Sequence, residues 1–205
     1  MTDRKTLDVY AGQAGRYAQK FATDTDKPKP TFDKFIRYIP EGGHVLDWGC
    51  GPGHWAARFA KAGFTVEATD ASPEMAALAR DKFGVEVRIE PFAALSAENQ
   101  FDAIWAHFSL LHAPRADFPG HLDQIARALK PEGHVLLGLK LGSGEQRDKL
   151  GRFYSFYEET ELRSLLADAG LKILHSHTGS EVGLSGEVSS FIIIIAQAVA
   201  EGDTL

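Results

Sequence analysis

Three glycines alternate with other residues directly after a short apolar strand, and an acidic residue stands at the end of that strand. Residues 44–55 are HVLDWGCGPGHW, in which Asp47 precedes Gly49, Gly51 and Gly53. Glycines at alternate positions allow a tight turn whose backbone a ligand can approach closely. A strand, such a turn and a helix start form a cradle for a nucleotide. A carboxylate at Asp47 would repel a pyrophosphate, but it suits a ligand that carries an ammonium group.

The spacing of the glycines also argues against a dinucleotide. The NAD fingerprint needs its third glycine three positions after the second, and His54 occupies that position here. A nicotinamide oxidoreductase is therefore a disfavoured alternative.

The segment VLDWGCGPG resembles the first motif of the class I S-adenosylmethionine-dependent methyltransferases, in which two apolar residues precede Asp or Glu and the glycines. Residues 64–80, 101–112 and 125–140 resemble the family's second strand and helix, its fourth strand, and its fifth strand with the preceding helix. The resemblance covers roughly residues 7–175 and is closest to small single-domain members similar to the tellurite-resistance-type enzymes. It implies S-adenosyl-L-methionine as cofactor, S-adenosyl-L-homocysteine as product and no metal.

Ligands of doubly wound sheets bind beyond the carboxyl ends of the strands. The resemblance implies that Asp70, at the end of the second strand, accepts the ribose hydroxyls and that Asp47 faces the methionine end. Gly49 and Gly51 are expected to approach the cofactor by their backbone, and Gly53 to serve the turn or helix packing. The residues expected to contact the cofactor are Tyr10, Tyr17, Asp47, Trp48, Gly49, Cys50, Gly51, His54, Asp70, Ala71, Met75, Phe92 and His107.

The third strand departs from the family pattern at its end. Many members have Asp-Ala there, with the Asp side chain bonding the adenine amine, whereas this sequence has Glu90-Pro91-Phe92. Glu90 could replace that Asp, but Pro91 lacks the backbone donor that usually meets the ring. The alternative is that Phe92 covers the adenine by stacking. Tyr10 and Tyr17 resemble an N-terminal tyrosine segment that closes over the cofactor in related enzymes.

Methyl transfer from a sulfonium is an in-line displacement that needs orientation and a water-poor pocket more than it needs catalytic groups. His107 and His112 follow the fourth strand and are the candidate catalytic residues, because histidine takes up a proton near neutral pH. Their alternative role is to shape the pocket. Ser109 lacks the nucleophile elbow of a hydrolase, and His175-x-His177 lacks an evident third metal ligand.

Residues 142–154 follow the fifth strand, begin with Gly-Ser-Gly and are predicted to form a loop on the substrate side of the sheet. Arg147 and Arg152 are the candidate substrate-side residues, and Lys140 is a third cation that could pair with an anionic group. A solvated loop is the alternative interpretation of this segment.

Strands alternate with helices along most of the chain, which predicts an α/β, Rossmann-like doubly wound sheet with helices on both faces. Residues 171–178 and 190–198 are two strands joined only by a loop, so they are expected to be antiparallel. Five parallel strands precede that pair. The predicted strands are 44–48, 64–69, 85–89, 101–106 and 134–140, and the predicted helices are 53–62, 73–83, 119–129 and 159–169.

The chain has 205 residues, a formal net charge of −6 and one cysteine. We expect a single domain with an N-terminal helical lid region (1–40), a Rossmann-like core (41–198) and a tail (199–205). The missing signal-peptide core and the single cysteine favour the cytoplasm, and the acidic balance disfavours nucleic acid. The predicted function is methylation of a small molecule by a monomer or homodimer. The alternatives are a catalytically silent cofactor-binding regulatory or partner protein, and an enzyme that methylates a macromolecule.

Overall fold

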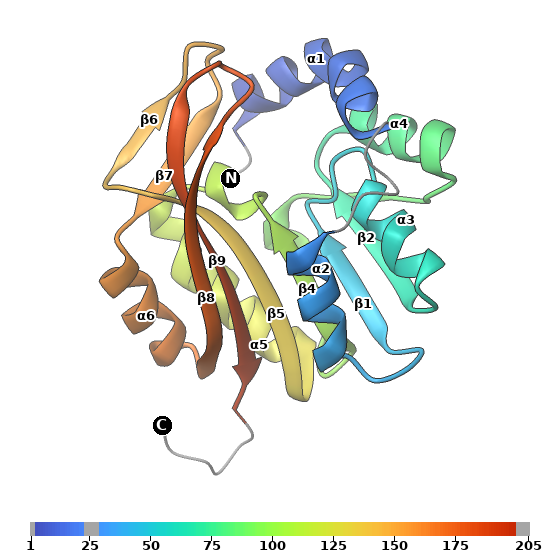
Figure 1. Cartoon of the computed structure of the whole chain (residues 1–205), viewed down its shortest axis with the longest axis vertical. Coiled ribbons are helices and arrows are strands. Elements are labelled where there is room, and N and C mark those ends of the chain that lie inside the picture. Colours follow the sequence, from blue (N-terminus) through green and yellow to red (C-terminus); the bar gives the residue numbers. More distant parts are fainter. Residues whose placement is uncertain (1–2, 23–28, 200–205) are drawn as a thin grey trace.

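The computed structural model describes residues 3–22 and 29–199, and of residues 14–22 it describes the backbone alone. Its sheet has the strand order β3-β2-β1-β4-β5-β7-β6, and β9 and β8 extend it beyond β5 (Figure 1). The predicted parallel strands are confirmed, and the strand order reverses between β1 and β4. Sheets of this kind bind ligands at that reversal, beyond the carboxyl ends of the strands. The parallel strands are β1 (His44–Trp48), β2 (Thr65–Asp70), β3 (Arg88–Ile89), β4 (Phe101–His107) and β5 (Leu129–Leu141).

Helices cover both faces of the sheet, as predicted. α2 and α3 pack on one face and α5 and α6 on the other. Successive side chains of β1 alternate between these faces, so Val45 joins the α2–α3 side while Leu46 and Trp48 join the α5–α6 side. The helices are α1 (Arg4–Ala22), α2 (Pro30–Phe35), α3 (His54–Lys61), α4 (Pro73–Phe83), α5 (Phe118–Ala128) and α6 (Glu159–Asp168).

Among the parallel strands, β3 and β5 differ most from their predicted lengths. β3 keeps only Arg88 and Ile89, which pair with the last two residues of β2. β5 begins at Leu129, five residues before the predicted start, because Leu129 pairs with Phe101 across a shift in register. These differences lie at strand ends, where local sequence patterns are least informative.

The chain ends in an antiparallel strand pair, as predicted. β8 (Leu171–Val182) pairs with β9 (Val188–Ala198), and β9 pairs antiparallel with β5. The turn between β8 and β9 lies near the carboxyl ends of the parallel strands (Figure 1).

The segment after β5 was expected to be a loop, and this prediction was wrong. It forms a hairpin of β6 (Glu145–Arg147) and β7 (Phe153–Tyr157). β7 pairs with Lys140 and Leu141, beyond the point where β4 has ended, while β9 occupies the other edge of β5. The hairpin therefore stands over the turn that follows β4 and forms a wall of the site.

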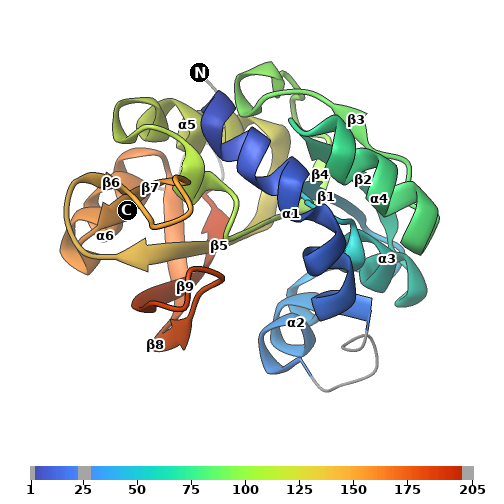
Figure 2. The same cartoon turned by 90° about the horizontal axis from the view of Figure 1, so that it is seen from above.

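The helix α1 lies across the carboxyl end of the sheet (blue in Figure 2). Asp3 caps it by accepting a hydrogen bond from the backbone N–H of Thr6, with a donor–acceptor distance of 2.8 Å. The Thr6 hydroxyl in turn accepts one from the backbone N–H of Phe153 in β7, and the rest of α1 reaches α4. The expected lid region is therefore helical. The division into lid, core and tail stays a prediction, because of the tail only Val199 is described.

Candidate functional site

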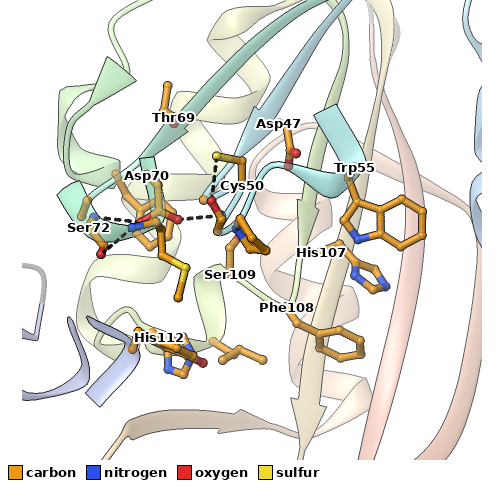
Figure 3. Close-up of a pocket in the computed structure, with 18 of the residues that line it drawn as sticks. Asp47, Cys50, Trp55, Thr69, Asp70, Ser72, His107, Phe108, Ser109 and His112 are labelled. Atoms are coloured by element: carbon orange, nitrogen blue, oxygen red, sulfur yellow. Dashed lines mark hydrogen bonds between the residues drawn. The ribbon is translucent and has the colours of Figure 1, made fainter. Parts of the chain in front are cut away.

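A cavity of about 620 Å³ lies beyond the carboxyl ends of β1, β2, β4 and β5, beneath α1 (Figure 3). Asp70 and Ser72 stand at one side of it, and Trp55, His107 and Phe108 stand at the other. Cavities of this size are typical of small-ligand sites. Thirteen of the predicted site residues lie in its wall. They are Tyr10, Asp47, Gly49, Cys50, Gly51, His54, Asp70, Ala71, Met75, Phe92, His107, His112 and Arg152.

The glycine turn carries the backbone in a conformation that other residues rarely adopt. Gly49 has φ of +77°, and a Cβ there would stand 2.5 Å from the Cβ of Ser109. Gly53 also has φ of +77°, and its Cβ would stand 2.7 Å from the Cβ of Ala79 in α4. Gly49 therefore permits the close approach of the turn after β4, whereas Gly53 permits the packing of α3 on α4.

Asp70 is held in place by two backbone donors. The N–H of Gly51 donates to one carboxylate oxygen and the N–H of Ser72 to the other, each at 2.8 Å. Burial raises the pKa of this carboxyl, and these donors oppose the shift. Ser72 also caps α4 through its hydroxyl, which accepts from the N–H of Met75 at 3.2 Å. Asp70 thus joins the glycine turn to the start of α4 and presents fixed acceptors to the cavity.

Asp47 is a buried carboxyl group, 2% exposed. Its Oδ2 finds no hydrogen-bond partner among the described residues. Burial raises its pKa to about 8; the backbone N–H of Ala56 lowers the pKa, and the charge of Asp70 raises it further. A buried acceptor without a partner costs free energy, so the cavity has a fixed place for a cationic or hydrogen-bond-donating ligand group.

The wall on the β2–β3 side is apolar and flat. Met75 is buried at the start of α4, and Phe92 lies in the Phe92–Ala94 turn after β3. The Phe92 ring meets Trp48 edge to face, with centroids 5.1 Å apart. A ligand whose hydroxyls bind Asp70 and whose ammonium binds Asp47 could place an adenine ring between Met75 and Phe92. The wall therefore offers apolar surface beside the two carboxyl groups.

The structure places two predicted site residues outside the cavity wall. Trp48 points to the α5–α6 side of the sheet because β1 alternates its side chains, and it packs against Phe92 and His121. Arg147 lies in β6 and pairs with Asp3 at the start of α1, at 2.7 Å. The structure therefore does not bring these two side chains to the cavity, and their contacts with a ligand stay predictions. The side chain of Tyr17 lies outside the described residues.

His107 lies in the aromatic part of the wall. Its ring stacks on Trp105, with centroids 5.2 Å apart and an interplanar angle of 22°, and meets Trp55 edge to face. Burial lowers its pKa to about 3, and electrostatic interactions with His54 and Lys29 act in the same direction. His107 is therefore neutral at neutral pH and a weak base.

His112 belongs to a hydrogen-bonded chain that includes the lid. Its Nδ1 lies 2.6 Å from the carbonyl oxygen of Phe153, which can only accept, so Nδ1 carries the proton. Nε2 then accepts from the hydroxyl of Tyr10 at 2.7 Å. Arg152 donates to the same hydroxyl at 3.3 Å and is itself paired with Asp148 at 2.6 Å. Burial lowers the pKa of His112 to about 4, so the ring is neutral and its lone pair is engaged.

Several residues of the wall were not predicted. Trp55 follows the glycine turn directly, so its proximity to the motif was the signal for it. Phe108 has a φ of +57°, a strained conformation for a bulky residue, and this places its ring in the cavity. Tyr154 and residues 182–184 come from β7 and from the turn between β8 and β9. No local sequence pattern marks Tyr154 or residues 182–184, because the register of the two hairpins brings them to the site.

The described part of the chain holds no group of three or more His, Cys, Asp or Glu side chains placed to bind a metal ion. None of its helices has the length and apolar character needed to cross a membrane.

Known proteins share this sequence pattern and fold. In sequence the chain is similar to methyltransferase GfsG of Streptomyces halstedii, at 34% identity over 110 residues, which cover 48% of this chain and 38% of that protein. In structure it is similar to the Burkholderia thailandensis 1,6-didemethyltoxoflavin-N1-methyltransferase bound to its substrate and S-adenosylhomocysteine (TM-score 0.71, 23% identity, 94% of this chain and 88% of that one). A TehB-like S-adenosylmethionine-dependent methyltransferase of Corynebacterium glutamicum is also similar (TM-score 0.70, 18% identity, 92% and 98%).

The chain spans about half the length of the curated relatives that it matches, from 38% to 54%. Residues 19–176 match the family model described as methyltransferase domain, and these residues include the glycine turn, Asp47 and Asp70. The chain therefore belongs to the methyltransferase domain family, whose cofactor is S-adenosylmethionine.

Proposed function

We propose that the chain transfers the methyl group of S-adenosylmethionine to a small-molecule acceptor. The observation that carries the proposal is the buried carboxyl of Asp47, whose Oδ2 has no partner among the described residues and which stands beside the glycine turn and Asp70 in one cavity. A buried, unpartnered acceptor next to fixed ribose acceptors matches the ammonium and the hydroxyls of the cofactor.

The chain's own part in the reaction is binding, orientation and the exclusion of water. When bound, the cofactor supplies an electrophilic methyl group on a sulfonium. Asp47 holds the ammonium and Asp70 the ribose, so the sulfonium between them is fixed along the ends of β1 and β2. The rings of His107 and Phe108 line the cavity beyond these strands. An apolar wall there favours in-line attack, because it excludes water from the sulfonium.

The small size of the acceptor is supported by the cavity and the lid. A volume of about 620 Å³ is within the range of small-ligand sites. α1 crosses above the cavity and is tied to β7, which leaves a macromolecule little direct access (Figure 2). The net charge of −6 disfavours a polyanionic partner such as nucleic acid.

Cofactor choice is tested by thermal unfolding of the protein with S-adenosylhomocysteine or with NAD. Ligands that bind the folded state raise Tm by mass action. We expect a rise with S-adenosylhomocysteine and none with NAD. Stabilisation by NAD alone would contradict the proposal.

Acceptor size is tested with a labelled methyl donor. The protein and methyl-labelled cofactor are incubated with a cell extract separated by ultrafiltration into small molecules and macromolecules. We expect enzyme-dependent label in the small-molecule fraction only. Label confined to macromolecules would support the rival acceptor class, and cofactor binding without label in either fraction would support a silent binding protein.

A further inference from the structure

A lysine at the end of β5 presents its charge to the cavity without a matching carboxylate. The Lys140 Nζ lies 4.0 Å from the centre of the Tyr154 ring, and the side chain is half-buried. No carboxylate of the described residues lies within ion-pairing distance of Nζ, 4.0 Å. Burial lowers the pKa of this ammonium and the charge of Arg152 adds to the effect, whereas the charges of Asp148, Glu181 and Glu187 oppose it. An anion from solution would offset part of the free-energy cost of holding this ammonium in a half-buried position.

The other charges near Lys140 do not supply the anion. Arg152 is 3% exposed and is neutralised by Asp148, to which its Nε and a terminal nitrogen both donate. Glu181 lines the cavity from β8 but is exposed and makes no ion pair with Lys140. Glu187 pairs with Lys149 at 3.2 Å. Among the described residues, this part of the cavity therefore offers one positive charge that makes no ion pair, which matches a monoanion better than a dianion.

The position of Lys140 separates it from the methyl donor. Asp47 and Asp70 end β1 and β2, whereas Lys140 ends β5, and β4 lies between β1 and β5. Neighbouring strands are about 4.8 Å apart, so the backbone of Lys140 lies roughly two strand spacings from that of β1. Attack on the methyl group needs a distance of about 3 Å. We therefore take an anion held by Lys140 to lie on the β5 side of the cavity, and the group that receives the methyl group to lie nearer to β1.

The surface between these two points is aromatic. His107 ends β4, Phe108 follows it, and Tyr154 lines the same cavity from β7. Such walls favour a flat ligand, because rings pack well against rings. A single planar ring spans about one strand spacing.

We propose that the acceptor is a flat molecule with one carboxylate, which Lys140 anchors while a separate nucleophilic group on the same molecule receives the methyl group. This inference rests on the proposed methyl transfer and adds the chemical class of the acceptor. A carboxylate accepts a hydrogen bond from the ammonium, and its charge remains after the transfer. The second group releases its proton to solvent and forms a bond to the methyl carbon as the bond from that carbon to sulfur breaks, and the cofactor leaves as the neutral thioether.

The test measures binding to the protein saturated with S-adenosylhomocysteine, by calorimetry. The probes are the three hydroxybenzoates and the three aminobenzoates, each compared with its own uncharged amide. We expect at least one acid to bind about tenfold more tightly than its amide, as a charge-assisted hydrogen bond would give. The variant Lys140→Met keeps the apolar stem and should abolish this preference, whereas Lys140→Arg should retain most of it. Lys172→Met, on an exposed part of β8, is the matched control and should bind like the wild type.

Unchanged affinity of Lys140→Met for S-adenosylhomocysteine shows that this variant is folded and that the cofactor site is intact. Failure of the anchor is then distinct from failure of the proposed function. The inference is overturned if every amide binds as tightly as its acid, or if Lys140→Met keeps the preference. A methyl ester as the product from any acid of the panel would overturn the anchoring role, and a methylated product that keeps its carboxylate supports it.

Discussion

Replacing Asp47 with Asn should stabilise the protein without its cofactor and weaken cofactor binding. With a pKa of about 8, Asp47 holds a proton in the folded protein between its ordinary pKa of 3.8 and about 8, whereas the unfolded chain has released it. Stability therefore falls as pH rises through this window, by about 1.4 kcal/mol per pH unit.

At pH 7 the raised pKa of Asp47 therefore lowers the free energy of unfolding by about 4 kcal/mol as an upper limit. The Asn amide needs hydrogen-bond partners of its own, which offsets about 1–3 kcal/mol of the gain. We expect a net stabilisation of about 1–3 kcal/mol, or a rise in Tm of roughly 2–12 °C for a chain of this size. Loss of the ammonium–carboxylate contact should weaken S-adenosylhomocysteine binding about tenfold or more.

Urea denaturation at pH 5 and pH 7 and calorimetric titration with S-adenosylhomocysteine measure both effects. The stability difference between Asp47→Asn and the wild type should narrow at the lower pH. Asp123→Asn, on the exposed side of α5, is the matched control and should change neither quantity. A variant that is less stable than the wild type at pH 7, or that binds the ligand equally well, would refute the role assigned to this carboxyl.

Three further predictions follow from the site. Affinity for S-adenosylhomocysteine should rise about tenfold per pH unit between pH 6 and 8 and then level off, because the ammonium of the ligand needs the ionised form of Asp47. Calorimetry in buffers of different ionisation enthalpy should detect that ligand binding releases nearly one proton at pH 7. Gly49→Ala should lower the free energy of unfolding by about 2 kcal/mol or more, since the new Cβ would stand 2.5 Å from the Cβ of Ser109 at a φ of +77°. Gly120→Ala on α5, where no atom stands within 4 Å of the new Cβ, is the control and should be neutral or stabilising in the same urea assay. Tyr10→Phe should cost about 1 kcal/mol, and a double-mutant cycle with His112→Phe should give a coupling of similar size if the 2.7 Å hydrogen bond links lid and core; additive effects would argue against that link.

Local patterns predicted the parallel core and most of the cofactor wall. The sequence 44–55 specifies strand, turn and helix by apolar residues, glycines and a helix start that lie next to one another, so Asp47, Gly49 and Gly51 follow from one short segment. Asp70 follows from the end of the next strand by the same logic. Trp48 is a different case. Both faces of β1 are buried, so only the tertiary structure shows that the Trp48 side chain points to the α5–α6 side and away from the cavity.

Residues beyond β5 were harder to place. Arg147 and Arg152 are both charged residues of one expected loop, yet one pairs with Asp3 outside the cavity and the other is buried in its wall. The difference arises because the segment is a hairpin whose β7 pairs with the end of β5. The pairing of distant strands depends on register across the sheet, which a local composition does not encode.

The amino-acid sequence by itself therefore determined the fold class, the cofactor and the two carboxyl groups that line the cavity, since all of these depend on neighbours within a few residues of the glycine turn or of a strand end. Only the tertiary structure decided the partnership of Tyr10 with His112, the burial of Arg152 and the charge of Lys140 beside Tyr154. Those groups come from α1, β5, β7 and the turn after β4. They meet because sheet register and lid packing bring them together, and they form the part of the cavity where the acceptor is expected.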